Sequence, residues 1–247
     1  MRGRTLAATA AIATLLTLGV GAALLPLSLA LPLSGVAIEG RPSGRVWDGR
    51  IEDARIEGLD LGTLDVGLRP LPLLTGRIAG RFALDGPVGV GTGEASARGG
   101  EVILSRYEGT VSLTALGAAG ALDAFGQPLR GEARIDARGL RLTQAGCQAG
   151  TLEVTTDLLA ETARRSGGLI EGPMLRGQGR CAGGVLDLPL EGRGADGAAA
   201  ARLRVAGRRY TTELVLRPDD PRAGRALAAY GFQRTPDGYS LVTRGAF

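Results

Sequence analysis

The sequence predicts an all-β protein, mainly antiparallel, with a transmembrane helix at its N-terminus and one short helix near its C-terminus. Three observations predict this class. Apolar and polar residues alternate along much of the 247-residue chain, 41 glycines punctuate the alternating runs, and an uncharged segment stands near the N-terminus. Alternation with a period of two is typical of strands that have one buried and one solvated face. The strands would form a curved open sheet or a sandwich-like pair, with one lobe or two.

The N-terminal segment predicts a membrane anchor. Residues 5–25 carry no charge and follow Arg2 and Arg4. As a helix this segment would be about 30 Å long, which is enough to cross the hydrocarbon core. The positive-inside rule keeps residues 1–4 in the cytoplasm and sends the membrane-exit segment 26–40, with all that follows, across the membrane. The alternative is a cleaved signal peptide, whose apolar region is typically shorter, about 7–15 residues.

Residues 41–247 predict the exported β domain. Alternating runs separated by glycine at a spacing of about 8–12 residues favour antiparallel hairpins over crossovers through helices. Small residues gather between positions 115 and 127, which would place a boundary between two lobes near residue 125. The main alternating runs are Leu64–Leu68, Ile78–Leu84, Val102–Leu104, Ala133–Ala137, Leu152–Val154, Leu186–Leu190, Ala201–Val205 and Tyr210–Leu216.

Two segments interrupt the alternation. Residues 158–165 predict a short helix whose basic C-terminal end suits the helix macrodipole. Residues 220–231 predict the C-terminal helix, because the segment starts with Asp-Pro and ends with Gly. Leu227 and Tyr230 would pack this helix against the sheet.

The two cysteines, Cys147 and Cys181, predict a disulfide, because disulfides persist in exported domains. The bridge would close a loop of about 35 residues, which the chain-entropy model values at roughly 4 kcal/mol. The alternative is a pair of buried free thiols.

The residue inventory argues against an active site. The chain has no histidine and no lysine, so it lacks Ser-His-Asp and Cys-His nucleophile arrangements and paired-His zinc motifs. Two cysteines alone offer too few zinc ligands. The glycine clusters at 89–93 and 192–197 lack the context of a phosphate-binding loop, so they predict turns. The sequence therefore predicts no enzyme, with no catalytic, metal-binding or cofactor-binding residue.

Charge gives no sign of a nucleic-acid partner. The net charge is +4, and the 25 acidic residues are interleaved with 29 basic ones, all of them arginine. Because no long basic run occurs, we interpret the charged residues as ordinary solvent-exposed surface groups and not as a nucleic-acid-binding site.

A leucine cluster and the single tryptophan are candidate contact residues. Leu71, Leu73 and Leu74 lie in a segment with two prolines, which cannot occupy a central strand. They could contact a membrane or a partner, but burial at a corner of the sheet is favoured because leucine clusters are usually buried. Trp47 could stack on a ligand, and a structural anchor in the core is the favoured role.

The order of these features carries a family resemblance. A basic start and one apolar span precede a G-x-x-W-x-G turn around Trp47, a Leu-Pro bend, and a later half with two cysteines. In this order they resemble the type II secretion system protein N family over nearly the whole chain. Further positions that fit are Gly44, Gly49, Leu68, Pro70, Gly76, Gly150, Asp157, Gly172, Pro173, Gly177, Leu188, Pro189, Leu190, Leu227, Gly231, Gly238, Tyr239 and Gly245.

This resemblance implies a non-catalytic accessory component of the type II secretion apparatus. It would be a single-pass protein of the cell inner membrane, with its C-terminal domain in the periplasm and other secretion subunits as partners. A weaker likeness, to AsmA-like periplasmic proteins, implies lipid binding or transport along an apolar concave face. A lipid-binding face would be continuous and exposed, whereas a scaffold would bury the same residues.

Overall fold

The computed structural model describes residues 26–30, 38–56, 58–118, 120, 126–165, 172–220 and 223–246. The predicted cytoplasmic residues 1–4 and transmembrane residues 5–25, with Arg2 and Arg4, lie outside this set, as does residue 125. None of the helices in the described ranges has the length and apolar character that crossing a membrane requires.

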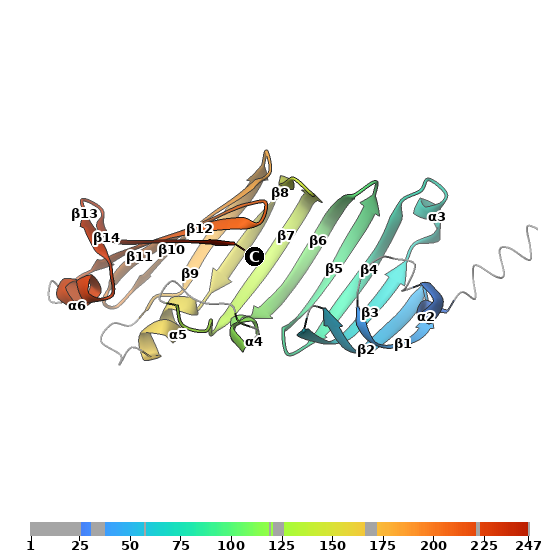
Figure 1. Cartoon of the computed structure of the whole chain (residues 1–247), viewed down its shortest axis with the longest axis horizontal. Helices are drawn as coiled ribbons and strands as arrows, with labels where there is room; N and C mark the ends of the chain where they lie inside the picture. The colour runs from blue at the N-terminus through green and yellow to red at the C-terminus, as the bar shows by residue number, and fades with distance from the viewer. Residues whose placement is uncertain are drawn as a thin grey trace, which may run out of the picture.

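The described residues form one open sheet of 14 strands (Figure 1). Neighbours in the sheet are antiparallel and follow chain order, except that β14 lies between β12 and β13. The all-β, antiparallel prediction is confirmed, with an open sheet in place of a sandwich. The strands are β1 (Glu39–Arg45), β2 (Asp48–Ile56), β3 (Leu59–Leu68), β4 (Ile78–Gly86), β5 (Gly89–Arg98), β6 (Glu101–Ser112), β7 (Glu132–Thr143), β8 (Gly146–Thr156), β9 (Leu175–Ala182), β10 (Val185–Gly194), β11 (Gly197–Ala206), β12 (Arg209–Pro218), β13 (Gln233–Thr235) and β14 (Gly238–Ala246).

Short helices precede the sheet or join its strands. They are α2 (Leu27–Ala30), α3 (Pro70–Leu73), α4 (Leu113–Ala118), α5 (Leu158–Arg165) and α6 (Ala223–Ala229).

Both helices expected from the sequence are present. The helix at 158–165 is confirmed as α5, and the C-terminal helix, α6, is shorter than predicted. Leu227 of α6 is buried, but Tyr230 is 54% exposed, so the predicted packing of Tyr230 is wrong. The chain turns at Gly231, whose φ is +87°, and Phe232 takes the buried position instead.

The sheet continues across the region where the sequence suggested a lobe boundary. The strands on either side, β6 and β7, pair from Val102 opposite Leu142 to Ser112 opposite Glu132. Their connection leaves the sheet through α4. The gathering of small residues therefore accompanies a long connection, while the strand pairing itself is unbroken.

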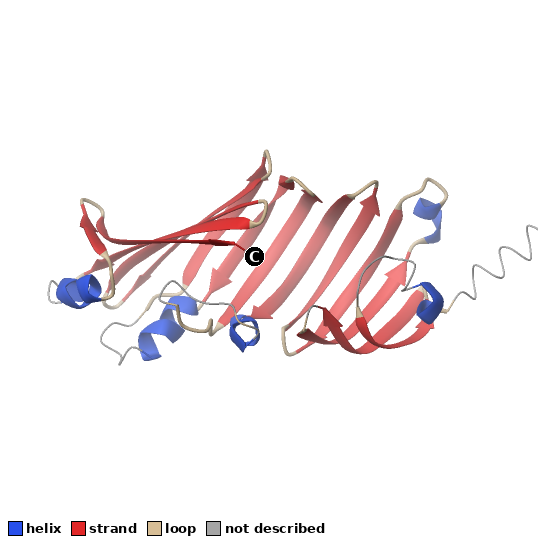
Figure 2. Cartoon of the chain, viewed as in Figure 1, coloured by secondary structure: helices blue, strands red, loops and turns tan. Residues whose placement is uncertain are grey.

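One face of this sheet, called the inner face below, is apolar from strand to strand. In the middle of the sheet Leu84 lies opposite Leu64 on one side and Gly91 on the other, and the row continues through Gly109 to Ile135. Both ends of the sheet curl toward the same side, so the sheet forms a trough (Figure 1). The helices α4 and α5 lie at that concave side (Figure 2).

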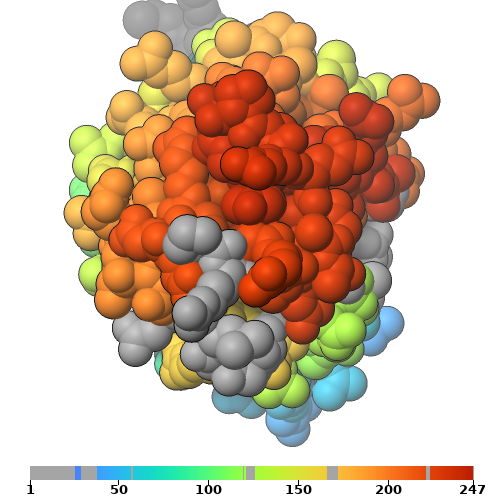
Figure 3. Space-filling model, turned by 90° about the vertical axis from the view of Figure 1, so that its left-hand side faces the viewer, coloured from blue at the N-terminus to red at the C-terminus, as the bar shows by residue number. Residues whose placement is uncertain are grey.

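Three apolar clusters lie along the trough. The first joins Leu27 of α2 to Ile51 of β2, and the second fills the inner face from β7 to β11. The third packs Leu227 of α6 on Leu214 of β12. Leu159 of α5 contacts both the second and the third cluster, so α5 holds them together. Residues of the C-terminal strands and α6 fill the end of the molecule that faces the viewer in Figure 3.

Glycines inside β5 let aromatic rings lie flat on the inner face. The cluster 89–93 was predicted to form a turn, but it lies within the strand, so that prediction is wrong. A Cβ atom on Gly93 would come within 2.5 Å of the ring of Phe82, and one on Gly91 within 2.8 Å of the Tyr107 hydroxyl. The two rings stack, with centroids 6.3 Å apart. Glycine is required here for side-chain packing across strands, whereas a turn would require it for backbone freedom.

Replacing Gly93 with valine tests this packing. Valine favours strands, yet its side chain would collide with Phe82, so we expect Gly93→Val to lower the free energy of unfolding by about 1–3 kcal/mol. Thr92→Val, on the exposed outer face of the same strand, is the matched control and should change stability by about 0.5 kcal/mol or less. Urea denaturation followed by Trp47 fluorescence measures both. Equal stability of the two variants would contradict the packing role.

Candidate functional site

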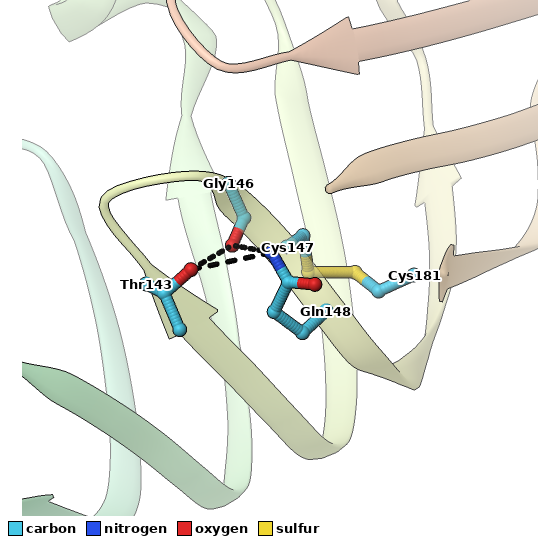
Figure 4. The surroundings of a disulfide bond; sticks show 5 residues. All are labelled: Thr143, Gly146, Cys147, Gln148 and Cys181. Atoms are coloured by element: carbon cyan, nitrogen blue, oxygen red, sulfur yellow. Dashed lines mark hydrogen bonds between the residues drawn. A yellow bond between two sulfur atoms is a disulfide. The ribbon is translucent and has the colours of Figure 1, made fainter. Parts of the chain in front are cut away.

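The predicted disulfide is present and joins β8 to β9 (Figure 4). Cys147 and Cys181 have Cα atoms 5.3 Å apart and are separated by 34 positions in sequence. The β8–β9 ladder ends where Thr151 lies opposite Arg180, so the bridge clamps the two strands just beyond their last pair. Beside it the Gln148 amide donates to the hydroxyl of Thr143 at 3.2 Å, which holds the β7–β8 turn. The bridge is therefore a structural element at the end of a strand pair.

The leucine cluster projects into solvent. Leu71 is 75% and Leu74 is 84% exposed, so the favoured expectation of burial at a sheet corner is wrong. Residues 69–77 are called the leucine loop below. Backbone groups within this loop hydrogen-bond to one another: the amide of Leu74 donates to the carbonyl of Leu71, and the amide of Thr75 donates to the carbonyl of Pro72. Because the loop closes on itself, it need not fold back onto the sheet. Leu73 is 37% exposed.

A row of exposed apolar residues continues the leucine loop along the sheet. Ile78, the first residue of β4, lies opposite Ala97, which lies opposite Val102, which lies opposite Leu142. Ile78, Val102 and Leu142 are 51%, 42% and 40% exposed. The name apolar rim is used below for Leu71, Leu73, Leu74, Ile78, Val102 and Leu142. Sequence reasoning missed the last three, because only strand register shows that they form one row beside the loop.

Arginines border the apolar rim. Arg69 forms an ion pair with Glu94 at 2.6 Å, and both line a pocket of about 290 Å³ beside α3, together with Arg77, Thr75 and Ser96. Arg77 forms no ion pair with a described residue. The pocket thus combines the Arg69–Glu94 ion pair, the Arg77 guanidinium and the hydroxyl groups of Thr75, Ser96 and Ser105, and the Thr75 hydroxyl donates to the carbonyl of Pro72.

Trp47 lies in the turn between β1 and β2. Its side chain is partly buried against the first apolar cluster, which includes Leu27 and Val46. The carbonyl of Val46 accepts a hydrogen bond from the Leu68 amide, so this turn is tied to the end of β3. These contacts suit the structural anchor that the sequence favoured.

Paired charges cover the outer face. Arg50 donates two hydrogen bonds to Asp65, at 2.6 and 3.0 Å, and Arg202 donates two to Asp187, at 2.8 and 2.9 Å. The hydrogen bond from Arg50 lowers the pKa of Asp65 below its ordinary value, with desolvation opposing it. Hydrogen bonds from Arg202 likewise lower the pKa of Asp187, and Arg204 adds to the effect. On this face, arginine side chains therefore form ion pairs with carboxylates and keep the surface polar.

No three cysteine, aspartate or glutamate side chains among the described residues are grouped in a way that could hold a metal ion. The carboxylates with lowered pKa on the outer face pair with arginine at the surface. What the arrangement offers chemically is contact surface: the concave inner face, the apolar rim and the edges of the sheet.

The two edges of the sheet differ. At one edge, β1 carries Pro42, and Pro26 bridges to Arg45 at its end. At the other edge, β13 pairs with β14 only at residues 238–240, so beyond Ser240 β14 pairs with β12 on one side and with no described strand on the other. An open edge of this kind is a template for another strand.

Comparison with known proteins gives one family match. The family model described as type II secretion system (T2SS), protein N, matches residues 34–242. No curated protein and no solved structure matches the chain.

Removing the disulfide should destabilise the fold. For the variant with Cys147→Ala and Cys181→Ala together, we expect the free energy of unfolding to fall by about 2–4 kcal/mol, because the unfolded chain regains the entropy of an open loop. Urea denaturation measures the change. The wild-type protein in reductant is the matched control and should unfold at the same urea concentration as the variant. Unfolding of the variant at the midpoint of the oxidised wild type would show that the bridge adds no stability.

The outer-face ion pairs predict loss of stability in acid. A carboxylate whose pKa is lowered by folding stabilises the protein fully above its unfolded pKa, about 3.9 for aspartate, and loses this contribution as pH falls. We expect the urea concentration at the unfolding midpoint to decrease as the pH is lowered below about 4. The decrease should be less steep in Asp187→Asn, which lacks one of these carboxylates. A pH dependence identical to that of the wild type would exclude a contribution from Asp187. The effect should be small, because exposed ion pairs are weak.

Proposed function

The chain belongs to the type II secretion system protein N family, and we propose that it acts as an accessory structural component of the type II secretion apparatus. In this proposal the uncharged segment 5–25 anchors the protein in the inner membrane, and the sheet lies in the periplasm. The protein works through contacts with other subunits of the apparatus and catalyses no reaction.

The observation that carries this proposal is the open antiparallel sheet. A long sheet that is not closed into a barrel leaves backbone donors and acceptors at its edges, and partner strands can pair with them. The part of β14 that extends beyond β13 contains no proline and includes Val242 at 48% exposure. By contrast, β1 is interrupted by Pro42, which cannot donate to a ladder. These features favour β14 as the edge that receives a partner strand.

One observation favours a second candidate function, lipid binding of the AsmA-like kind. The inner face is continuous and apolar, and between β3 and β6 its side chains are only half-buried, among them Val66, Phe82 and Leu104. A face of this kind could take acyl chains. The helices and terminal strands cover part of the same face, as a scaffold requires.

A deletion strain tests the proposed role. Loss of the gene should reduce export of folded periplasmic substrates, and the wild-type gene should restore it. Unchanged secretion with altered outer-membrane lipid would contradict the proposal and favour the lipid-binding candidate.

Photo-crosslinking tests the contact edge in the restored strain. A photoreactive amino acid at Val242 should crosslink to subunits of the secretion apparatus, identified by mass spectrometry. The matched control is Val90, which is 57% exposed on the outer face of the central strand β5. Equal crosslinking from the two positions would contradict a specific role of the β14 edge.

A further inference from the structure

We propose that the apolar rim and its bordering arginines form a docking surface for an anionic phospholipid membrane. The inference rests on the proposed anchoring and adds a second, peripheral contact, by which the sheet lies against the bilayer that holds its anchor. The residues are the apolar rim defined above, with Arg77 and Arg98.

The point at which the N-terminal segment joins the fold places the rim near the membrane. Residues 1–25 precede Pro26, which bridges to Arg45 at the end of β1. The next residue, Val46, accepts a hydrogen bond at 3.0 Å from Leu68, the last residue of β3. The leucine loop starts directly after Leu68. The chain therefore enters the fold at the same end of the strands as the leucine loop, and both α2 and α3 lie toward the right-hand end of the molecule in Figure 1.

The exposed apolar side chains are arranged as a rim. From Ile78 in β4 to Leu142 in β7 the row crosses four adjacent strands, a width of roughly 14 Å at the usual strand spacing. The leucine loop extends the row with Leu71 and Leu74, the two most exposed large apolar residues in the described chain. Soluble domains seldom expose so many large apolar side chains side by side without a partner. An edge of this form can enter the interface of a bilayer, as the apolar face of an interfacial helix does.

Charge along the rim is unbalanced toward positive. Glu94 is paired with Arg69, and Glu101 is paired with Arg141 at 3.1 Å. Arg77 and Arg98 are exposed and form no ion pair with a described residue. Arg50 and Arg202, elsewhere on the outer face, are matched by carboxylates. The unmatched guanidinium groups beside exposed leucines suit the combination of acyl chains and phosphate that a phospholipid presents.

The pocket beside α3 strengthens the choice of phospholipid over a protein partner. Its lining residues come from the leucine loop, β4, β5 and β6, and they include Arg69, Arg77 and the carboxylate of Glu94, which pairs with Arg69. The guanidinium of Arg77 is therefore available to a phosphate group beside the leucine loop. An apolar protein partner would leave Arg77 without an acceptor.

Site-specific fluorescence in vesicles tests the proposal on the full chain. The wild-type cysteines are both in the disulfide, so a cysteine introduced by Leu74→Cys is the only free thiol and can carry an environment-sensitive dye. The protein is reconstituted in vesicles of phosphatidylethanolamine and phosphatidylglycerol, with and without a lipid that carries a quencher on its acyl chain. We expect the dye at position 74 to emit at shorter wavelength and to lose most of its emission to the quencher.

Met174→Cys provides the matched control. Met174 is also apolar and 56% exposed, but it precedes β9 at the opposite end of the strands, so its dye should be insensitive to the quencher. Replacing both arginines, Arg77→Ala with Arg98→Ala, should reduce quenching at position 74 in anionic vesicles and leave it unchanged in vesicles of phosphatidylcholine. Equal quenching at positions 74 and 174 would overturn the proposal, and a protein partner would then be the alternative occupant.

An alkaline carbonate wash separates this result from the anchoring itself. Quenching is read before the wash and decides the docking surface. Retention of the protein in the vesicles after the wash decides the anchor. Quenching at position 74 followed by loss of the protein would support the docking surface and contradict the anchor, while retention without quenching would do the reverse.

Discussion

Strand register is the constraint on which the rest of the structure depends. A slip of one residue between two neighbours would move every apolar side chain of one strand to the solvated face. Along the row from Leu64 in β3 to Val154 in β8, each inner-face residue faces another inner-face residue. Tight turns maintain this register, as at Gly99 and Gly100, whose φ values of +58° and +81° suit a two-residue hairpin. The apolar clusters, the disulfide and the apolar rim all follow from that alignment.

Bulges restore the alignment where the alternation in the sequence fails. Ile51 and Ala54 are both buried although they are three residues apart, a spacing that would place them on opposite faces of a regular strand. The register shifts between them, and Asp53 adopts a left-handed conformation with φ of +52°, so Ala54 returns to the inner face. Further shifts occur in the pairs β5–β6 and β7–β8. Because a bulge also bends and twists its strand, these shifts contribute to the curvature of the trough.

Features that depend on the local sequence pattern could be predicted from the sequence. Features that depend on residues brought together from different strands by folding could not. Alternation gave the fold class and most strands, and the compartment argument gave the disulfide. Gly93 was misread as a turn residue because the ring that requires it, Phe82, comes from another strand. Exposure of Leu74 was missed because a leucine cluster alone does not reveal that its loop is self-contained. Val102 and Leu142 entered the candidate surface only through their register.

An open sheet also explains how this chain can present apolar surface and remain folded. In a sandwich a second sheet would cover the whole inner face. Here the cover comes from small elements that pack at particular places, such as α6 over Leu214 and α5 beside it. Phe82, in β4, belongs to none of the three apolar clusters and stays half-buried. The fold is thus stabilised strand by strand through pairing and local clusters, which leaves the apolar rim exposed and part of the inner face half-buried.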